Sequence, residues 1–319
     1  MNGNESNNTF HGEFHILAFH RYTEHQLLLF IWVLLMYVAS MVGNATIIIL
    51  VCLEANLRTP MYFFLCNLSA QDIVYVSAIL PKLLYITITS DTSIYFSCCI
   101  TQMFLFAFCV GTEFFLLTCM SYDRYVAICL PLSYTLIMNK KVCIILATSS
   151  WFLGGLNSMM HSLIMANLSF CNGQEINHVF CDVKTLLKMS CSDTTNIQIL
   201  IIVEGIFFGF LPFLLIITSY VYILCAILQI RHSAGRLKVF SSCSSHVTVV
   251  VLFSLTFLSV NLKPKSKHSQ EQDKMLSLLY IVLIPLLNPL VYSLRNKDVL
   301  KALKKVIARN IPKVYIEAQ

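Results

Sequence analysis

Residues 120–129 read Met-Ser-Tyr-Asp-Arg-Tyr-Val-Ala-Ile-Cys, and this stretch decides the fold. It places an acid–arginine pair, Asp123 and Arg124, at the end of a long apolar segment. A single charge at a membrane boundary needs no special explanation, because an arginine side chain can extend to the lipid headgroups. The complete string is more informative, and its meaning depends on the apolar segment before it and on similar segments elsewhere.

The composition excludes a soluble globular protein. Of the 319 residues, 57% are hydrophobic and only 12% are charged, whereas soluble proteins carry roughly 25% charged residues. A membrane-spanning helix needs about 20 mostly apolar residues, and the alternating strands of a membrane barrel are absent from the sequence. We predict an all-α membrane protein, a seven-helix bundle in one domain. The predicted spans are Leu27–Leu53, Met61–Leu80, Cys99–Tyr122, Val142–Leu163, Ile197–Gln229, Val239–Leu262 and Met275–Leu294.

The ends of the chain indicate its orientation. We expect an extracellular, glycosylated N-terminus (1–26), the bundle (27–294) and a cytoplasmic tail (295–319), with N-glycosylation patterns at Asn4 and Asn7. No small-residue cleavage site follows the first apolar run, so it is expected to be an uncleaved signal anchor. With the N-terminus outside, lysine and arginine are in excess on the cytoplasmic face. That excess explains the net charge of +6 and favours anionic lipid and acidic cytosolic partners, with no reason to invoke nucleic acid.

Motifs along nearly the whole chain resemble those of odorant receptors, which belong to the rhodopsin-like G-protein-coupled receptors. The tail after Asn296 alternates apolar residues with lysines, which predicts a short amphipathic eighth helix on the inner leaflet. The strings that carry the resemblance are Gly43-Asn44, Arg58-Thr-Pro-Met-Tyr-Phe-Phe-Leu-Cys-Asn-Leu-Ser69, residues 120–129, Lys238-Val-Phe-Ser-Ser-Cys-Ser-Ser-His246 and Pro285-Leu-Leu-Asn-Pro-Leu-Val-Tyr-Ser-Leu-Arg-Asn296.

The resemblance implies a receptor that binds a small, mostly hydrophobic volatile within the bundle. It implies activation of a stimulatory, olfactory-type heterotrimeric G protein, a rise in cAMP, and a place in the plasma membrane of olfactory sensory neuron cilia. Two alternatives stay open: a receptor for an endogenous metabolite outside the nose, and a proton- or sodium-coupled transporter. Transporters often show internal repeats with interrupted helices, which we do not find. No nucleophile with a base at workable spacing indicates an enzyme.

The same resemblance assigns residues to G-protein coupling and activation. Arg124 is expected to engage the G protein when the bundle opens, and Asp123 to restrain it until then. Asn288 and Tyr292 lie one helical turn apart and are expected to move together toward Arg124. The full set is Asp123, Arg124, Tyr125, Tyr220, Lys238, His246, Asn288, Pro289 and Tyr292.

Three acids, Asp72, Glu113 and Glu204, lie inside apolar segments. A charge at the bilayer centre costs roughly 2.5–3.5 kcal/mol, so such residues face the bundle interior or a water cavity. The alternative is a protonated carboxyl that hydrogen-bonds a neighbour for packing. By the resemblance Asp72 and Glu113 face each other, and because two carboxylates repel, we expect a sodium ion or a proton there. No other metal or cofactor is expected.

The resemblance places the ligand among the third, fifth, sixth and seventh helices. An apolar and aromatic lining suits a small hydrophobic molecule. Glu204 is the one charged candidate, and its alternatives are packing or a pair with an outer-loop lysine. Tyrosines common in the sixth helix of the family are replaced by Ser254 and Asn261. The expected lining is Phe106, Ala107, Val110, Gly111, Glu204, Phe208, Ser254, Phe257, Leu258, Asn261 and Ile281.

Five cysteines are expected on the outer side, where an oxidising environment favours disulfides. They are Cys98, Cys99, Cys171, Cys181 and Cys191, and sequence alone cannot fix their connectivity. The resemblance implies the pairs Cys99–Cys181 and Cys171–Cys191, with the choice between Cys98 and Cys99 left open. No pattern at zinc-ligand spacing appears.

Overall fold

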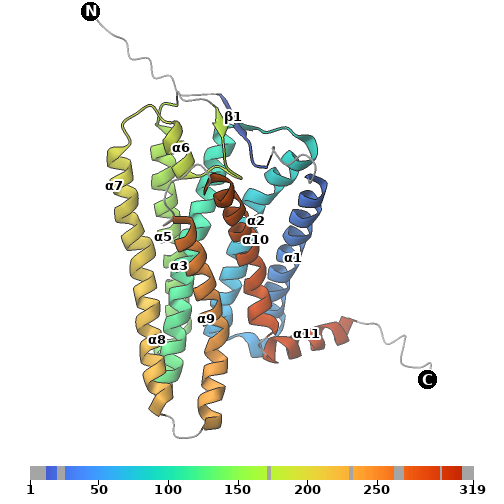
Figure 1. The fold of residues 1–319 in the computed structure, drawn as a ribbon. Helices are drawn as coiled ribbons and strands as arrows, with labels where there is room; N and C mark the ends of the chain where they lie inside the picture. Colours follow the sequence, from blue (N-terminus) through green and yellow to red (C-terminus); the bar gives the residue numbers. More distant parts are fainter. Residues whose placement is uncertain are drawn as a thin grey trace, which may run out of the picture.

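The structure, a computed structural model, describes residues 12–19, 26–170, 174–229, 233–261, 269–294 and 297–310. Long helices run side by side as one bundle, with the N-terminal strand at one end and the last helix at the other (Figure 1). The predicted glycosylation sites Asn4 and Asn7 lie outside the described residues.

All seven predicted spans fall on helices. Six spans are long and apolar enough to cross a membrane, and the remaining one, α9, contains a shorter apolar stretch, Cys243–Leu255, within the residues described. The predicted seven-helix membrane fold is therefore confirmed. The helices are α1 (Gln26–Leu53), α2 (Pro60–Thr89), α3 (Phe96–Cys129), α5 (Lys140–Ala166), a fifth span of α7 (Thr195–Glu204), η4 (Gly205–Phe210) and α8 (Leu211–Gln229), then α9 (Ser233–Asn261) and α10 (Ser269–Leu294).

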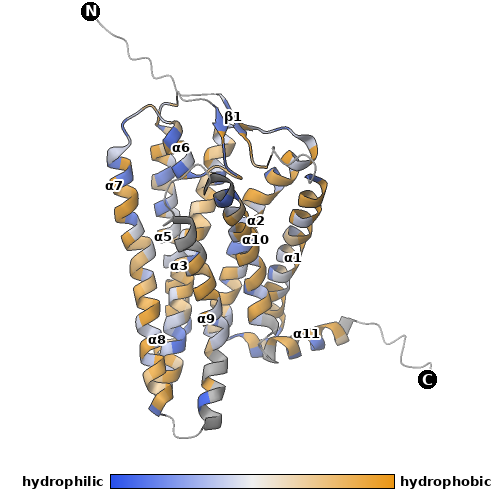
Figure 2. Cartoon of the chain, in the orientation of Figure 1, coloured by the Kyte–Doolittle hydropathy of each residue, from blue (hydrophilic) through white to orange (hydrophobic). Residues whose placement is uncertain are grey.

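Lipid replaces water as the solvent of this bundle. Apolar side chains cover the outward faces of the helices, most continuously on α1, α7 and α8 (Figure 2). Leu35 is 63% exposed and Ile202 is 65% exposed. In water such a surface would promote association, whereas in a bilayer it contacts acyl chains at no cost.

The fifth span contains a π-helical segment, η4, immediately before Pro212. A proline inside a helix lacks the amide proton for the usual hydrogen bond, and its ring crowds the carbonyl one turn earlier. A wider π turn relieves that crowding, and such turns occur frequently at functional sites. Gly205 and Gly209 lie within η4.

A small sheet covers the outer end of the bundle. β1 (Glu13–Ile16) pairs antiparallel with β2 (Ser93–Tyr95) and parallel with β3 (Glu175–Ile176). Phe14 and Ile16 on β1 are fully buried. The segment that the sequence assigned to a polar N-terminus therefore contributes a strand, which is too short for its alternation to stand out. The helix α6 (Val183–Met189) lies on the same side.

The inner end carries shorter elements. They are η2 (Ala55–Leu57), η3 (Pro131–Ser133), α4 (Tyr134–Ile137) and α11 (Lys297–Asn310). The last of these, α11, runs sideways from the foot of α10 (Figure 1). It is held against the bundle by buried Val299 and Ala302, and Lys305 Nζ donates to Glu54 Oε2 at 2.6 Å. The structure thus has the predicted helix in the tail, while its position on the inner leaflet stays a prediction.

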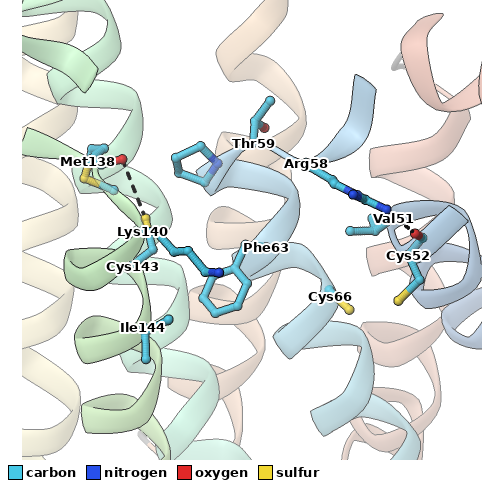
Figure 3. Close-up of a pocket in the computed structure, with 11 residues that line it drawn as sticks. Val51, Cys52, Arg58, Thr59, Phe63, Cys66, Met138, Lys140, Cys143 and Ile144 are labelled. Atoms are coloured by element: carbon cyan, nitrogen blue, oxygen red, sulfur yellow. Dashed lines mark hydrogen bonds between the residues drawn. The ribbon is translucent and has the colours of Figure 1, made fainter. Parts of the chain in front are cut away.

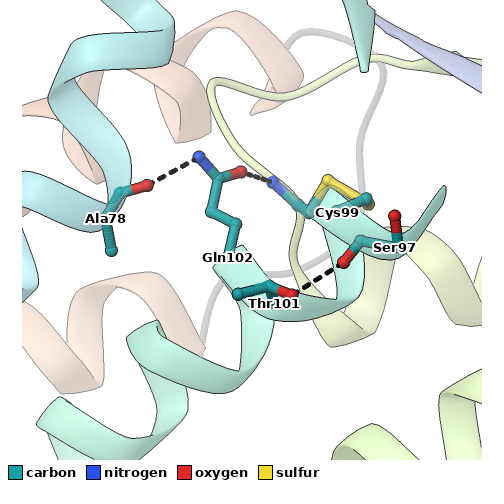
Figure 4. Close-up of a disulfide and its surroundings, with 6 residues drawn as sticks. Ala78, Ser97, Cys99, Thr101 and Gln102 are labelled. Carbon is teal, nitrogen blue, oxygen red and sulfur yellow. Dashed lines mark hydrogen bonds between the residues drawn. A yellow bond between two sulfur atoms is a disulfide. The ribbon is translucent and has the colours of Figure 1, made fainter. Parts of the chain in front are cut away.

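The disulfide Cys99–Cys181 fixes the middle loop to the top of α3 (Figure 4). Gln102 reinforces the link, because its Nε2 donates to the Ala78 carbonyl and its Oε1 accepts from the Cys181 amide, both at 3.0 Å. Cys98 is exposed and has a free thiol, so the open choice is settled in favour of Cys99. Cys191 is also disulfide-bonded, and its predicted partner Cys171 lies outside the described residues.

Cys99→Ser should destabilise the receptor, whereas Cys98→Ser should not. Loss of a bridge that spans 82 residues is expected to cost about 2–4 kcal/mol. Thermal unfolding of the purified receptor measures the difference, with Cys98→Ser as the matched control. Equal stability of the two variants would contradict the assignment of the bridge to Cys99.

Close approach of α3 and α5 depends on a glycine, as is usual for helices packed in a membrane. A Cβ on Gly154 would lie 2.9 Å from the Thr112 amide nitrogen and 3.0 Å from the Phe108 carbonyl oxygen. Because backbone atoms cannot move aside cheaply, Gly154→Ala should lower stability by about 1–3 kcal/mol. Gly155→Ala is the control, since its Cβ meets only a Phe108 ring carbon at 3.4 Å. A melting temperature for Gly154→Ala equal to that of the control would show that the helices can separate.

Candidate functional site

A cavity of about 200 Å³ lies between α3, α5, α6 and the fifth span, in the outer half of the bundle. The helix α6 closes its outer side through Asp182, Val183 and Lys184. Six of the side chains expected to line a ligand site do line this cavity. They are Phe106, Ala107, Val110, Gly111, Glu204 and Phe208.

The other expected lining residues lie elsewhere or outside the description. Ile281 is fully buried and Ser254 partly buried, and among the described residues neither lines the cavity. The side chains of Phe257, Leu258 and Asn261 are outside the described part of α9. The structure therefore gathers the residues of the third and fifth spans around one space.

Two buried polar side chains meet in this cavity. Glu204 Oε2 lies 2.6 Å from His161 Nε2, which comes from α5. Asn157, one turn earlier on α5, also lines the space. Sequence reasoning left Glu204 with a ligand, packing or an outer-loop lysine, and it gave His161 no role in binding. No short-range spacing connects residues 161 and 204, so only the fold reveals the pair.

A second polar cluster lies deeper in the bundle. Asn288 Nδ2 on α10 donates to Asp72 Oδ2 on α2 at 2.9 Å, and the same amide interacts with Glu113 on α3. Asp72 and Glu113 are buried, as predicted, and the structure brings them together. Asp72 Oδ1 and Glu113 Oε1 are buried without a hydrogen-bond partner among the described residues. This leaves carboxylate oxygens available to a small cation or a proton.

At the inner end of α3, Asp123 is buried and Arg124 partly buried. The Tyr134 hydroxyl on α4 donates to Asp123 Oδ1 at 2.8 Å. Burial and the neighbouring Asp123 carboxyl raise the pKa of Tyr134, so this hydroxyl keeps its proton and remains a donor. The second inner loop is thereby attached to the acid that precedes Arg124.

Tyr220 and His246 connect the fifth and sixth spans. The carbonyl oxygen of Leu117 lies 3.1 Å from His246 Nε2 and can only accept, so Nε2 carries the proton. His246 Nδ1 therefore accepts from the Tyr220 hydroxyl at 2.5 Å. Because Leu117 belongs to α3, one buried histidine joins three spans, and its removal would leave a carbonyl and a hydroxyl without their partner.

The remaining expected switch residues are placed as follows. Pro289 packs against Gly43 on α1, where a Cβ would lie 3.0 Å from the proline ring. Tyr125 contacts the rings of Tyr122 and Tyr222, at centroid distances of 6.3 and 5.8 Å. Tyr292 is buried and its hydroxyl has no hydrogen-bond partner in the described part of the chain. The Lys238 side chain is not described.

A groove of about 600 Å³ opens on the inner half of the bundle, between the ends of α1, α2 and α5 (Figure 3). Its walls are apolar, with Phe63 and Ile144 among them, and two cations, Arg58 and Lys140, lie at its inner edge. Arg58 also donates to the Cys52 carbonyl at 3.2 Å. The groove therefore combines an apolar interior with a positive rim.

Comparison with known proteins identifies the family. The family model for olfactory receptors matches residues 33–310. The chain is 44% identical to Olfactory receptor 1F1 of Homo sapiens over 297 residues, which are 93% of this chain and 95% of that protein. It is 44% identical to Olfactory receptor 1E16 of Mus musculus over 305 residues, covering 96% and 97%. It is 42% identical to Olfactory receptor 1f45 of Rattus norvegicus over 300 residues, covering 94% and 96%.

These relatives are receptors, so the transporter interpretation is set aside and the expectation that the chain is not an enzyme is confirmed. The spans, the outer disulfide and the cavity are consistent with that family. This chain is a member of the olfactory receptor family, the multi-pass membrane receptors that sense odorants and couple to G proteins.

Proposed function

We propose that this receptor binds a small, mostly hydrophobic volatile in the outer cavity and activates a stimulatory, olfactory-type G protein, which raises cAMP. The observation that carries the ligand site is the cavity of about 200 Å³ whose lining includes the Phe106 and Phe208 rings. A buried apolar cavity of this size favours small molecules, because burial of apolar surface supplies most of the binding free energy.

Aromatic contacts provide a route from the cavity to the inner end. Phe114 lines the cavity and packs edge-to-face on Phe253 of α9, with ring centroids 4.6 Å apart. Two turns further along α9, His246 bonds to Tyr220 and Leu117. A ligand that displaces Phe114 would therefore act on the helix that holds the inner ends of three spans together. A differential affinity of a few kcal/mol for the two bundle states is enough to shift their populations.

The inner end supplies the coupling site in this proposal. Arg124 is expected to contact the G protein once α9 moves outward, and Asp123 to hold the resting arrangement together with Tyr134. The N-terminus lies outside, since lysine and arginine favour the opposite face. The proposed location is the plasma membrane of olfactory sensory neuron cilia, and a receptor for an endogenous metabolite in another tissue is the second candidate.

We further propose that Asp72 and Glu113 share a sodium ion or a proton in the resting state. Support comes from Asp72 Oδ1 and Glu113 Oε1, which are buried without a partner among the described residues. Two unscreened carboxylates at such a site repel each other, and a cation or proton removes that repulsion. Asn288, which bonds to Asp72, connects this site to α10.

Membrane lipid is the proposed partner of the inner groove. Anionic headgroups of the inner leaflet are attracted by basic side chains near the membrane surface. Arg58 and Lys140 supply that charge at the rim, and the apolar walls suit an acyl chain.

Arg124→Ala should abolish the odorant-evoked cAMP response while surface expression persists. The reason is that its side chain supplies the proposed contact with the G protein. A cAMP assay in cells that express the receptor with an olfactory-type G protein, screened against a broad odorant panel, measures the effect. Lys301→Ala, which removes an exposed cation from α11, is the control. A full response from Arg124→Ala at equal surface expression contradicts this role.

Asp72→Asn should remove the stabilisation of the receptor by sodium. At a concentration ten times its dissociation constant, a bound ion stabilises a protein by about 1.4 kcal/mol. Thermal unfolding in sodium chloride and in choline chloride of equal ionic strength measures this difference. Asp91→Asn, on an exposed outer turn, should keep the sodium effect. A sodium effect that survives in Asp72→Asn excludes this site, whereas an Asp72-dependent pH effect without sodium dependence assigns a proton to it.

A further inference from the structure

We infer that the outer cavity selects small hydrophobic amines, with the ammonium group held by Glu204, His161 and Asn157. This inference rests on the proposed function, because it names the chemical class of ligand for the same cavity. It goes further, since nothing in the general odorant-binding role requires a cationic ligand.

The first step is the burial of the acid and its partner. Glu204 is 6% exposed and His161 is 9% exposed, and both line the cavity. A buried carboxylate is costly unless all its hydrogen-bonding capacity is used. The imidazole contacts Oε2 alone, and Oε1 has no hydrogen-bond partner among the described residues.

The second step concerns the proton on His161. A carboxylate oxygen can only accept, so Nε2 carries the proton and donates toward Glu204 Oε2. In the neutral ring Nδ1 is then an acceptor, and it too has no partner in the described part of the chain. The same holds for Asn157 Oδ1. Glu204, His161 and Asn157 thus each present an acceptor oxygen or nitrogen that the protein itself leaves unsatisfied.

The third step compares ligand classes with that arrangement. A primary ammonium carries three N–H donors and a positive charge, so it satisfies the three acceptors and neutralises Glu204. An alcohol carries one donor and leaves two acceptors unsatisfied. A carboxylic acid, once ionised, carries only acceptors and is repelled by Glu204. Leaving buried polar groups unpaired costs the most in such discrimination.

The other charged side chains around the cavity do not change this assignment. Asp182 and Lys184 lie at the α6 side of the cavity, and the Asp182 side chain also accepts from the Lys184 amide at 3.1 Å. Their opposite charges offset each other at the mouth. Glu204 therefore determines the sign of charge that the interior accepts.

The remaining walls select a hydrophobic body. Phe106, Val110 and Phe208 line the same cavity as the polar group. Gly205, the first residue of the π turn after Glu204, also lines it, and a Cβ there would meet nothing within 4 Å. The open space beside Glu204 is therefore maintained by the absence of a side chain, and a short alkyl or aryl group attached to the nitrogen can occupy it.

The experiment measures binding directly, without a G protein. The full chain is purified in lipid nanodiscs, and its thermal unfolding is followed with a primary alkyl amine, the alcohol and carboxylic acid of the same chain length, and the N-trimethylated amine. The primary amine should raise the melting temperature most, at the lowest concentration. The trimethylated probe has the charge but no N–H donor, so it should bind more weakly.

Glu204→Gln should weaken binding of the primary amine by about 10- to 100-fold, as expected for loss of a hydrogen bond to a charged group. His161→Gln and Asn157→Leu should weaken it less. Glu175→Gln makes the same chemical change on the exposed strand β3, outside the cavity, and should bind the amine like the wild type.

Two results overturn the inference. One is wild-type receptor that binds the alcohol or the acid as tightly as the amine, a comparison that needs no variant. The other is unchanged amine affinity in a folded Glu204→Gln, which would make the Glu204–His161 pair a packing contact. A cAMP assay with the same probes separates this inference from the proposed function. Responses to non-amines alone reject the amine and keep the receptor role, whereas amine binding without any G-protein response rejects that role alone.

Discussion

The bilayer interior offers no water to hydrogen-bond a polar group, and this constraint organises the receptor. Polar side chains in the spans are satisfied by other helices. Asn44 Nδ2 on α1 donates to the Pro285 carbonyl of α10 at 2.8 Å, and Trp151 Nε1 on α5 donates to Asn67 on α2 at 3.0 Å. The Pro285 carbonyl can accept from α1 because Pro289, one turn later, lacks an amide proton. Proline and asparagine in one helix thus become a fastening between two.

Where satisfaction is incomplete, function becomes possible. Unpartnered buried atoms among the described residues gather in the outer cavity at Glu204, His161 and Asn157, and in the middle of the bundle at Asp72 and Glu113. A fully satisfied network would hold one arrangement of the helices. Incomplete networks lower the cost of a ligand or an ion that completes them, so the same physics that stabilises the bundle also creates its binding sites.

Much of the fold follows from the sequence, because a membrane span is a local property of about 20 residues. The spans and the membrane class were therefore predictable, and the resemblance supplied the Cys99–Cys181 bridge. Three features were not. The strand β1 is too short to show a period, the π turn depends on crowding around Pro212, and the contact of His161 with Glu204 requires two distant segments to meet. Properties that arise from tertiary contact leave no local signal, which is why the polar end of the cavity was seen only in the structure.

The position of that polar end bears on how this receptor differs within its family. A tyrosine common in the sixth span is replaced by Ser254, which among the described residues does not line the cavity. The polar contact instead lies on α5 and α7, on the opposite wall. A ligand held there cannot act on α9 through a tyrosine at position 254, so its action has to pass through packing. Phe114 is suited to this, because it lines the cavity and its ring rests on Phe253. Recognition and transmission are then carried by different side chains, a polar group that selects the ligand and an aromatic pair that reports its presence to the sixth span.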